Sequence, residues 1–112
     1  MKHCKSVLIV KEHFMDYDIS TESIADYFHI PVYKVSRALT DITGKSYSDY
    51  IIFLRLQYAK ELLSQSDLSV AEICRKIGYS SVSYFIKIFR EAEGITPAKY
   101  LKRRQGKKQE KS

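Results

Sequence analysis

The stretch from Tyr47 to Gln65 carries two rows of apolar residues at helical spacing. The rows are Tyr47, Ile51, Leu54, Tyr58 and Leu62, and Ile52, Leu56, Ala59 and Leu63. Together they cover most of the helix circumference, which is not typical of a surface helix. Asp49 and Arg55 interrupt the apolar run, so a membrane span is excluded. The pattern predicts a helix over 47–65, about 28 Å long at 1.5 Å per residue, buried on two sides between two small lobes.

Three shorter helices are predicted before this one, within residues 1–16, over 21–28 and over 32–43. Ser20 is a candidate N-cap for the second helix, and Ser46 is one for the helix over 47–65. Pro31 ends the second helix because proline cannot continue it. Gly44 is expected to terminate the third in a left-handed conformation. The expected inward positions are Val7, Val10, Phe14, Ile24, Ala25, Phe28, Val35, Ala38, Leu39 and Ile42.

The second half of the chain predicts three more helices, over 70–77, 82–93 and 97–104. Ser69 and Glu72 have the spacing of a capping box, Gly94 stops the helix over 82–93, and Pro97 suits a first helical position. Residues 105–112 are polar and basic, which is typical of a disordered tail. The inward positions of this half are expected to be Ile73, Cys74, Ile77, Phe85, Ile88 and Phe89.

The two halves repeat each other. At a shift of 49, Ser20, Ile24, Ala25, Phe28 and Ile30 align with Ser69, Ile73, Cys74, Ile77 and Tyr79. One extra residue in the second turn changes the shift to 50, at which Val35, Leu39, Gly44 and Tyr50 align with Phe85, Phe89, Gly94 and Tyr100. The same register pairs exposed positions: Tyr33 with Ser83, Ser36 with Ile86, and Arg37 with Lys87.

A short helix, a tight turn and a second helix form a helix–turn–helix unit. The second helix of such a unit fits the major groove of DNA, and successive grooves on one face lie about 34 Å apart. Two units joined by a rigid helix of about 28 Å suit that spacing without a dimer. The sequence therefore predicts an all-α fold, a seven-helix bundle of two helix–turn–helix lobes joined by a long central helix.

The composition excludes several classes of protein and of site but does not itself indicate DNA binding. The net charge is +6, but the whole excess of basic residues lies from Lys99 onward. The net charge is therefore a property of the C-terminal end and not of the rest of the chain. Two cysteines do not make a disulfide scaffold, and Cys74 is expected to be a reduced, buried thiol, which favours the cytoplasm. No signal peptide or membrane span is visible. The histidines share no metal spacing with the cysteines, and no catalytic motif appears. We therefore expect no enzyme activity, catalytic residues, metal or cofactor.

Two stretches carry a resemblance to a known family, AEICRKIGYSSVSYFIKIFREAEGITPAKYLK at 71–102 and LRLQYAKELL at 54–63. They resemble the AraC/XylS-type transcriptional regulators, and the first unit also fits that pattern. The resemblance covers roughly residues 7–104 and makes 1–104 an AraC-type DNA-binding domain, with helix–turn–helix units at 21–43 and 70–93. It implies a bacterial transcription regulator, most often an activator, that inserts the helices over 32–43 and 82–93 into adjacent major grooves.

The matched positions give the candidate contacts. The residues expected at base edges are Tyr33, Ser36, Arg37, Val82, Ser83, Ile86 and Lys87. The residues expected at phosphates are Ser20, Thr21, Lys34, Lys45, Ser69, Ser81 and Arg90. Arginine binds guanine O6 and N7 in a bidentate manner, whereas lysine favours the same acceptors with less geometric restriction. Tyr33, Val82 and the methylene groups of the serines are candidates for packing on thymine methyl groups.

Two departures from the family pattern affect these contacts. Pro31 stands where the family usually has a serine or threonine cap, so the first recognition helix starts without one, at a cost of about 1 kcal/mol. Val82 and Ile86 make the second recognition helix rather apolar, which leaves Lys87 with most of the polar contacts.

Double-stranded DNA is the expected partner, together with RNA polymerase and a sensory or receiver domain N-terminal to this chain; no membrane partner is expected. The alternative is a helical protein–protein interaction module without specific DNA binding. On that interpretation Arg37 and Lys87 are solvated surface charges. Arg55 is expected to be internal, as a salt-bridge partner of Asp49 or Glu72.

Overall fold

The computed structural model describes the backbone of residues 2–102 and the side chains of residues 7–102. Its helices are α1 (Lys2–His13), α2 (Thr21–Phe28), α3 (Val32–Thr43), α4 (Tyr47–Gln65), α5 (Val70–Lys76) and α6 (Val82–Glu93). Residues 97–102 form a seventh helix that runs to the end of the described chain. No strand occurs within residues 2–102. The predicted all-α, seven-helix fold is confirmed.

Helix boundaries follow from local capping residues. Ser20 and Ser69 each close a capping box, in which the serine hydroxyl accepts from the backbone amide three residues later, at 3.0 and 3.1 Å. Ser46 accepts from the amide of Asp49 at 3.2 Å and begins α4 in the same way. Gly44 and Gly94 end α3 and α6 with φ values of 75° and 82°. Glycine adopts this left-handed conformation without the steric cost that a side chain imposes.

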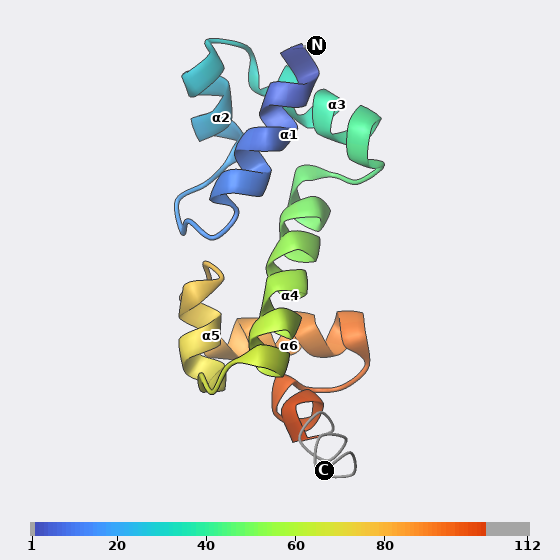
Figure 1. Ribbon diagram of the computed structural model, residues 1–112. Helices are drawn as coiled ribbons and strands as arrows, with labels where there is room; N and C mark the ends of the chain where they lie inside the picture. The colour runs from blue at the N-terminus through green and yellow to red at the C-terminus, as the bar shows by residue number, and fades with distance from the viewer. Residues whose placement is uncertain (1, 103–112) are drawn as a thin grey trace. The chain divides into compact units, whose positions relative to one another are not determined.

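The chain divides into two compact units, Met1–Arg55 and Leu56–Ser112. Helix α4 is one uninterrupted helix whose first half belongs to unit 1 and whose second half belongs to unit 2 (Figure 1). This division matches the prediction that a long helix joins two lobes. Both halves of α4 contribute buried residues, Tyr50 and Ile51 in unit 1 and Leu56, Ala59 and Leu63 in unit 2. The remaining residues of the two apolar rows are partly buried.

Unit 1 has a core contributed by α1, α2, α3 and the first half of α4. Its buried members are Val7, Val10, Ile24, Ala25, Val35, Leu39, Tyr50 and Ile51. Two side chains of α4 fasten it to the loop between α1 and α2. The Tyr47 hydroxyl donates to the carbonyl oxygen of Ile19 at 2.9 Å. The Arg55 guanidinium donates to the carbonyl oxygens of Phe14 and Asp16 at 2.6 and 2.8 Å.

Unit 2 has a more aromatic core. The Phe85 ring stacks on Tyr79 and meets the edge of Phe89, which in turn meets Tyr100. Cys74 is fully buried, and its thiol contacts the Tyr79 carbonyl oxygen at 3.4 Å. The expected buried thiol is confirmed. An ion pair of 3.4 Å between Lys60 of α4 and Glu93 of α6 crosses the surface of this unit.

The structure corrects three details and confirms that Arg55 is internal. Helix α1 ends at His13 rather than at 16, because the amide of Asp16 turns back to the carbonyl of His13 at 3.0 Å. Helix α5 ends at Lys76, with Ile77 as its C-cap. Ile42, predicted to be buried, is 46% exposed, because the last turn of α3 extends beyond the core that covers Leu39. Arg55 is internal as expected, with backbone carbonyls of the α1–α2 loop as its hydrogen-bond acceptors.

Two predictions lie outside the described residues. The last helix was expected to reach residue 104, and its described part ends at 102. The predicted disordered tail, 105–112, falls entirely outside the described part of the chain.

Candidate nucleic-acid interface

The two helix–turn–helix units have the same turn. His29 follows α2 as its C-cap, and Gly78 takes the equivalent position, two residues after the end of α5. Both residues have positive φ, at 57° and 108°. The next amide, that of Ile30 or Tyr79, donates 3.0 Å back to the carbonyl five residues earlier. After this shared turn the second unit has one residue more before its recognition helix. The predicted change of shift from 49 to 50 therefore occurs where the sequence placed it.

The recognition helices α3 and α6 also share one pattern of burial. Val35, Ala38 and Leu39 are buried in α3, and Phe85, Ile88 and Phe89 are buried in α6 at the same positions. The opposite faces are exposed at the predicted base-contact positions 33, 37, 83 and 87. Each unit by itself therefore presents equivalent positions to solvent, as the repeat predicts.

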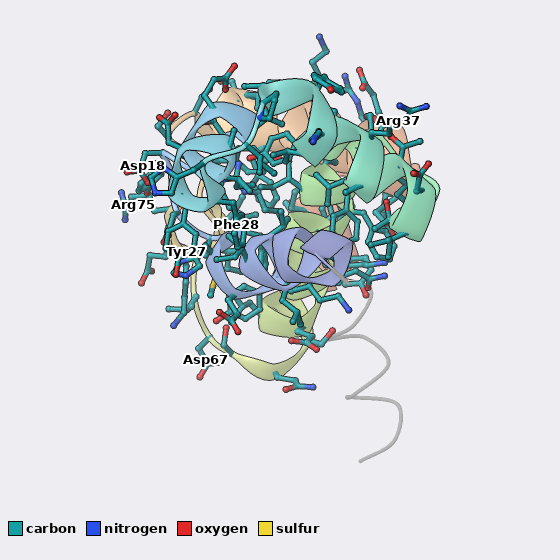
Figure 2. All side chains as sticks on the ribbon, turned by 90° about the horizontal axis from the view of Figure 1, so that it is seen from above. Asp18, Tyr27, Phe28, Arg37, Asp67 and Arg75 are labelled. Atoms are coloured by element: carbon teal, nitrogen blue, oxygen red, sulfur yellow. The ribbon has the colours of Figure 1, made fainter. Side chains whose placement is uncertain are left out.

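Arg37 and Tyr33 dominate the exposed face of α3. Figure 2 shows the Arg37 side chain on the outer side of α3, away from α1, whereas Phe28 points inward. Tyr33 is 62% exposed, and Ser36 beside it is half-buried. A planar guanidinium flanked by a hydroxyl and a phenol is suited to hydrogen bonding with base edges.

Helix α6 begins differently. The Ser81 hydroxyl caps it by accepting from the amide of Tyr84 at 3.2 Å, whereas Pro31 gives α3 no side-chain cap, as predicted. Tyr84 packs its ring edge-on against Tyr79 at 5.6 Å between centroids. Val82 and Ile86 are half-buried, and Ser83 and Lys87 are exposed. The outward face of α6 therefore combines one apolar strip with one polar strip.

The predicted phosphate-contact residues lie at helix starts and on exposed surfaces. The hydroxyl oxygens of Ser20, Ser69 and Ser81 are acceptors in the N-caps. The Ser69 hydroxyl also hydrogen-bonds the Glu72 carboxylate, so a phosphate has to compete with that carboxylate. The Thr21 hydroxyl donates to the Glu22 carboxylate at 3.2 Å, so an incoming phosphate has to compete with that carboxylate. Lys34 and Arg90 are exposed.

Lys45 differs from the other candidate cations. Its ammonium lies 5.4 Å from the centre of the Phe53 ring. The two residues belong to the loop before α4 and to α4 itself. A cation–π contact of this kind holds the ammonium near the surface of unit 1 without neutralising it, so it remains available to a phosphate.

The capping carboxylate of unit 2 is held in its charged form. Hydrogen bonds from the side chain and backbone of Ser69 lower the pKa of Glu72. Burial raises the pKa of the Cys74 thiol, so this cysteine stays protonated. Neither group offers chemistry beyond holding its helix in place.

Unit 1 also contains an acidic cavity of about 340 Å³, which the sequence did not indicate. Its lining includes Glu12, His13, Asp16, Asp18 and Tyr27 from α1, α2 and the intervening loop. Carboxylates repel phosphates, so this side of unit 1 is unsuited to the DNA backbone. Within residues 7–102, whose side chains the structure describes, no group of three His, Cys, Asp or Glu side chains is arranged to hold a metal ion.

The sequence missed the ties made by Tyr47 and Arg55, whose partners lie 28 to 41 residues away. No periodicity or capping motif encodes such contacts. The sequence did contain one indication of these contacts. Arg55 lies within the apolar run of α4, where a charged side chain that is buried needs hydrogen-bond partners.

The helix–turn–helix domain family matches residues 24–103, which include most of the first helix–turn–helix and all of the second. The chain belongs to the AraC/XylS-type helix–turn–helix family. It is 32% identical to the regulatory protein PocR of Salmonella typhimurium, over 86% of this chain and 31% of PocR. It is 30% identical to the transcriptional activator RhaS of Escherichia coli, over 87% of this chain and 34% of RhaS. The chain thus spans about a third of the length of these AraC/XylS-type relatives.

The fold agrees with a solved member that binds DNA. The DNA-binding domain of AdpA, in a crystal structure with a target DNA, superposes with a TM-score of 0.86 and 25% identity, over 94% of each chain. No helix among the described residues is both long enough and apolar enough to cross a bilayer.

Proposed function

We propose that this AraC/XylS-type domain binds double-stranded DNA sequence-specifically and activates bacterial transcription. Helices α3 and α6 enter two successive major grooves, and α4 is the rigid connection between them. The observation that carries the proposal is the matched register of α3 and α6, in which equivalent positions are buried and equivalent positions are exposed. If the second helix–turn–helix had no role in DNA binding, its exposed positions would not need to match those of the first.

The base-edge contacts in this proposal are those of Tyr33, Ser36 and Arg37 in α3 and of Val82, Ser83, Ile86 and Lys87 in α6. The phosphate contacts are those of Ser20, Thr21, Lys34, Lys45, Ser69, Ser81 and Arg90. The exposed positions of Arg37 and Lys87 support base contact, since both lie in the N-terminal half of a recognition helix, where base edges are read.

Two further partners follow from activation. RNA polymerase is the proposed protein partner, because an activator acts by contacting it. A sensory or receiver domain N-terminal to this domain is the proposed source of the signal, in keeping with curated relatives about three times as long. The proposed site of action is the cytoplasm.

An electrophoretic mobility comparison tests the function. The 112-residue chain is used to select sequences from a random duplex library, and the enriched duplex is compared with its scrambled counterpart. We expect binding of the enriched duplex to be at least about 100-fold tighter, within the range of specific to nonspecific ratios. Failure to enrich any sequence, together with equal binding of both duplexes, would support the interaction-module alternative instead.

A further inference from the structure

We propose that the second recognition helix, α6, identifies thymine by its methyl group, through Ile86 with Val82. The inference rests on the proposed DNA-binding function and goes further, because it names the base that one half-site must contain. The first recognition helix has no equivalent of Ile86. The two half-sites of the operator are therefore chemically different.

Ser36 and Ile86 hold the same position in two copies of one structural unit. Both follow a fully buried residue, Val35 or Phe85, and both are half-buried in their own unit. The core of each unit therefore covers them to a similar degree. The difference between them is chemical: α3 has a hydroxyl where α6 has a branched hydrocarbon.

A hydrocarbon side chain restricts what α6 can recognise at this position. Isoleucine has no donor or acceptor, so it cannot pair with the hydrogen-bonding edge of any base. The one apolar feature in the major groove is the C5 methyl group of thymine. Burying that methyl against Ile86 removes apolar surface of both groups from water. A hydrogen-bonding base edge at the same place would instead lose its contacts with water.

Val82 extends the apolar strip. It begins α6 and lies four residues before Ile86, so the two side chains share one side of the helix. Both are half-buried, with part of each surface in contact with solvent. The exposed Ser83 and Lys87 form a parallel strip, also four residues apart. Helix α6 can therefore hold a thymine methyl on one strip while Lys87 takes an acceptor of a neighbouring base or a phosphate.

Uracil substitution tests this contact directly, because replacing thymine by uracil removes the methyl group and leaves every hydrogen-bonding group in place. The probe is the duplex that the 112-residue chain enriches from a random library. The half-site whose base preference relaxes in Arg37→Ala belongs to α3, and the other belongs to α6. We expect each contacted thymine in the α6 half-site to weaken binding by about 3- to 5-fold when it becomes uracil.

Two variants assign the effect to Ile86. Ile86→Ser gives α6 the residue that α3 has at the equivalent position, and we expect uracil to cost less than about 1.5-fold in this variant. Ile42→Ser is the matched control, since it makes the same change at an isoleucine that is 46% exposed at the far end of α3. We expect the control to keep the full uracil penalty.

The possible outcomes distinguish the thymine contact from DNA binding itself. An enriched duplex that tolerates uracil throughout the α6 half-site overturns the thymine inference and leaves specific DNA binding intact. Retention of the full uracil penalty in Ile86→Ser overturns it as well. The uracil comparison on the native chain does not use Ile86→Ser, so it decides the question even if that variant does not fold. If no sequence is enriched, the proposed function itself fails.

Discussion

Arg37 in α3 and Lys87 in α6 occupy the same position in two copies of one helix–turn–helix unit. Each is exposed, each lies two residues after a buried core residue, and each is followed directly by another. A pair of cations held in this way by two separate cores is unlike an arbitrary pair of surface charges. The two side chains differ in chemistry: Arg37 has a planar guanidinium that can donate two parallel hydrogen bonds, whereas Lys87 has a compact ammonium. The two half-sites are therefore recognised by different contacts.

Replacing Arg37 by alanine should weaken binding to the enriched duplex by about 1–3 kcal/mol and relax the preference at one base pair. The reason is the loss of a bidentate contact with guanine O6 and N7. Mobility-shift titrations on the enriched duplex and on one with 7-deazaguanine at that base pair measure both effects. Lys11→Ala, at an exposed position of α1, is the control. An equal loss on enriched and random DNA would show that Arg37 contacts only phosphate.

Replacing Arg55 by alanine should lower the free energy of unfolding of unit 1 by about 2–4 kcal/mol. Arg55 is 8% exposed, and its guanidinium donates to the carbonyl oxygens of Phe14 and Asp16, which the alanine variant leaves without that donor. Urea unfolding followed by circular dichroism measures the change. Lys11→Ala should change it by less than about 0.5 kcal/mol. An Arg55→Ala variant as stable as this control contradicts the proposed fastening of α4 to unit 1.

Glu72 should make unit 2 sensitive to acid. Its pKa is lowered in the folded chain by hydrogen bonds with Ser69. A lowered folded-state pKa means that the stabilisation is complete above the ordinary carboxyl pKa and disappears as the pH falls through the lowered value. Urea unfolding of the native chain and of Glu72→Gln should therefore differ at pH 7 and converge once the pH falls below the lowered pKa of Glu72. If the difference in unfolding free energy between the two chains does not change with pH, the effect of Glu72→Gln comes from side-chain shape and not from the charge of Glu72.

Deleting residues 105–112 should flatten the salt dependence of binding and leave the base preference intact. Each of Lys107, Lys108 and Lys111 that pairs with a phosphate contributes about 0.9 to the slope of log K against log salt. Titrations of the full and shortened chains between 50 and 200 mM salt measure the slope, and a repeated selection measures the preference. If the preference disappears with the tail, the assignment of specificity to α3 and α6 is wrong.

The helices were predictable to within a few residues because their ends are encoded locally. Ser20, Ser69, Gly44 and Gly94 act within one helical turn, so sequence spacing is sufficient to locate them. The register of the repeat was predictable because each unit has its own core. The contacts of Arg55 were not, because they join segments about 40 residues apart. Ile42 was misjudged because periodicity gives the direction of a side chain but not the extent of the core that covers it.

The spacing between half-sites tests the central claim most directly. If α4 holds the two recognition helices at a fixed separation, as we propose, binding should require half-sites one helical turn of DNA apart, about 10–10.5 base pairs from centre to centre. Five base pairs inserted between the half-sites of the enriched duplex move them to opposite faces of the helix. We predict that this insertion reduces binding to the level of a duplex with one half-site. Unchanged affinity after the insertion would contradict the claim that α4 holds the two recognition helices at a fixed separation.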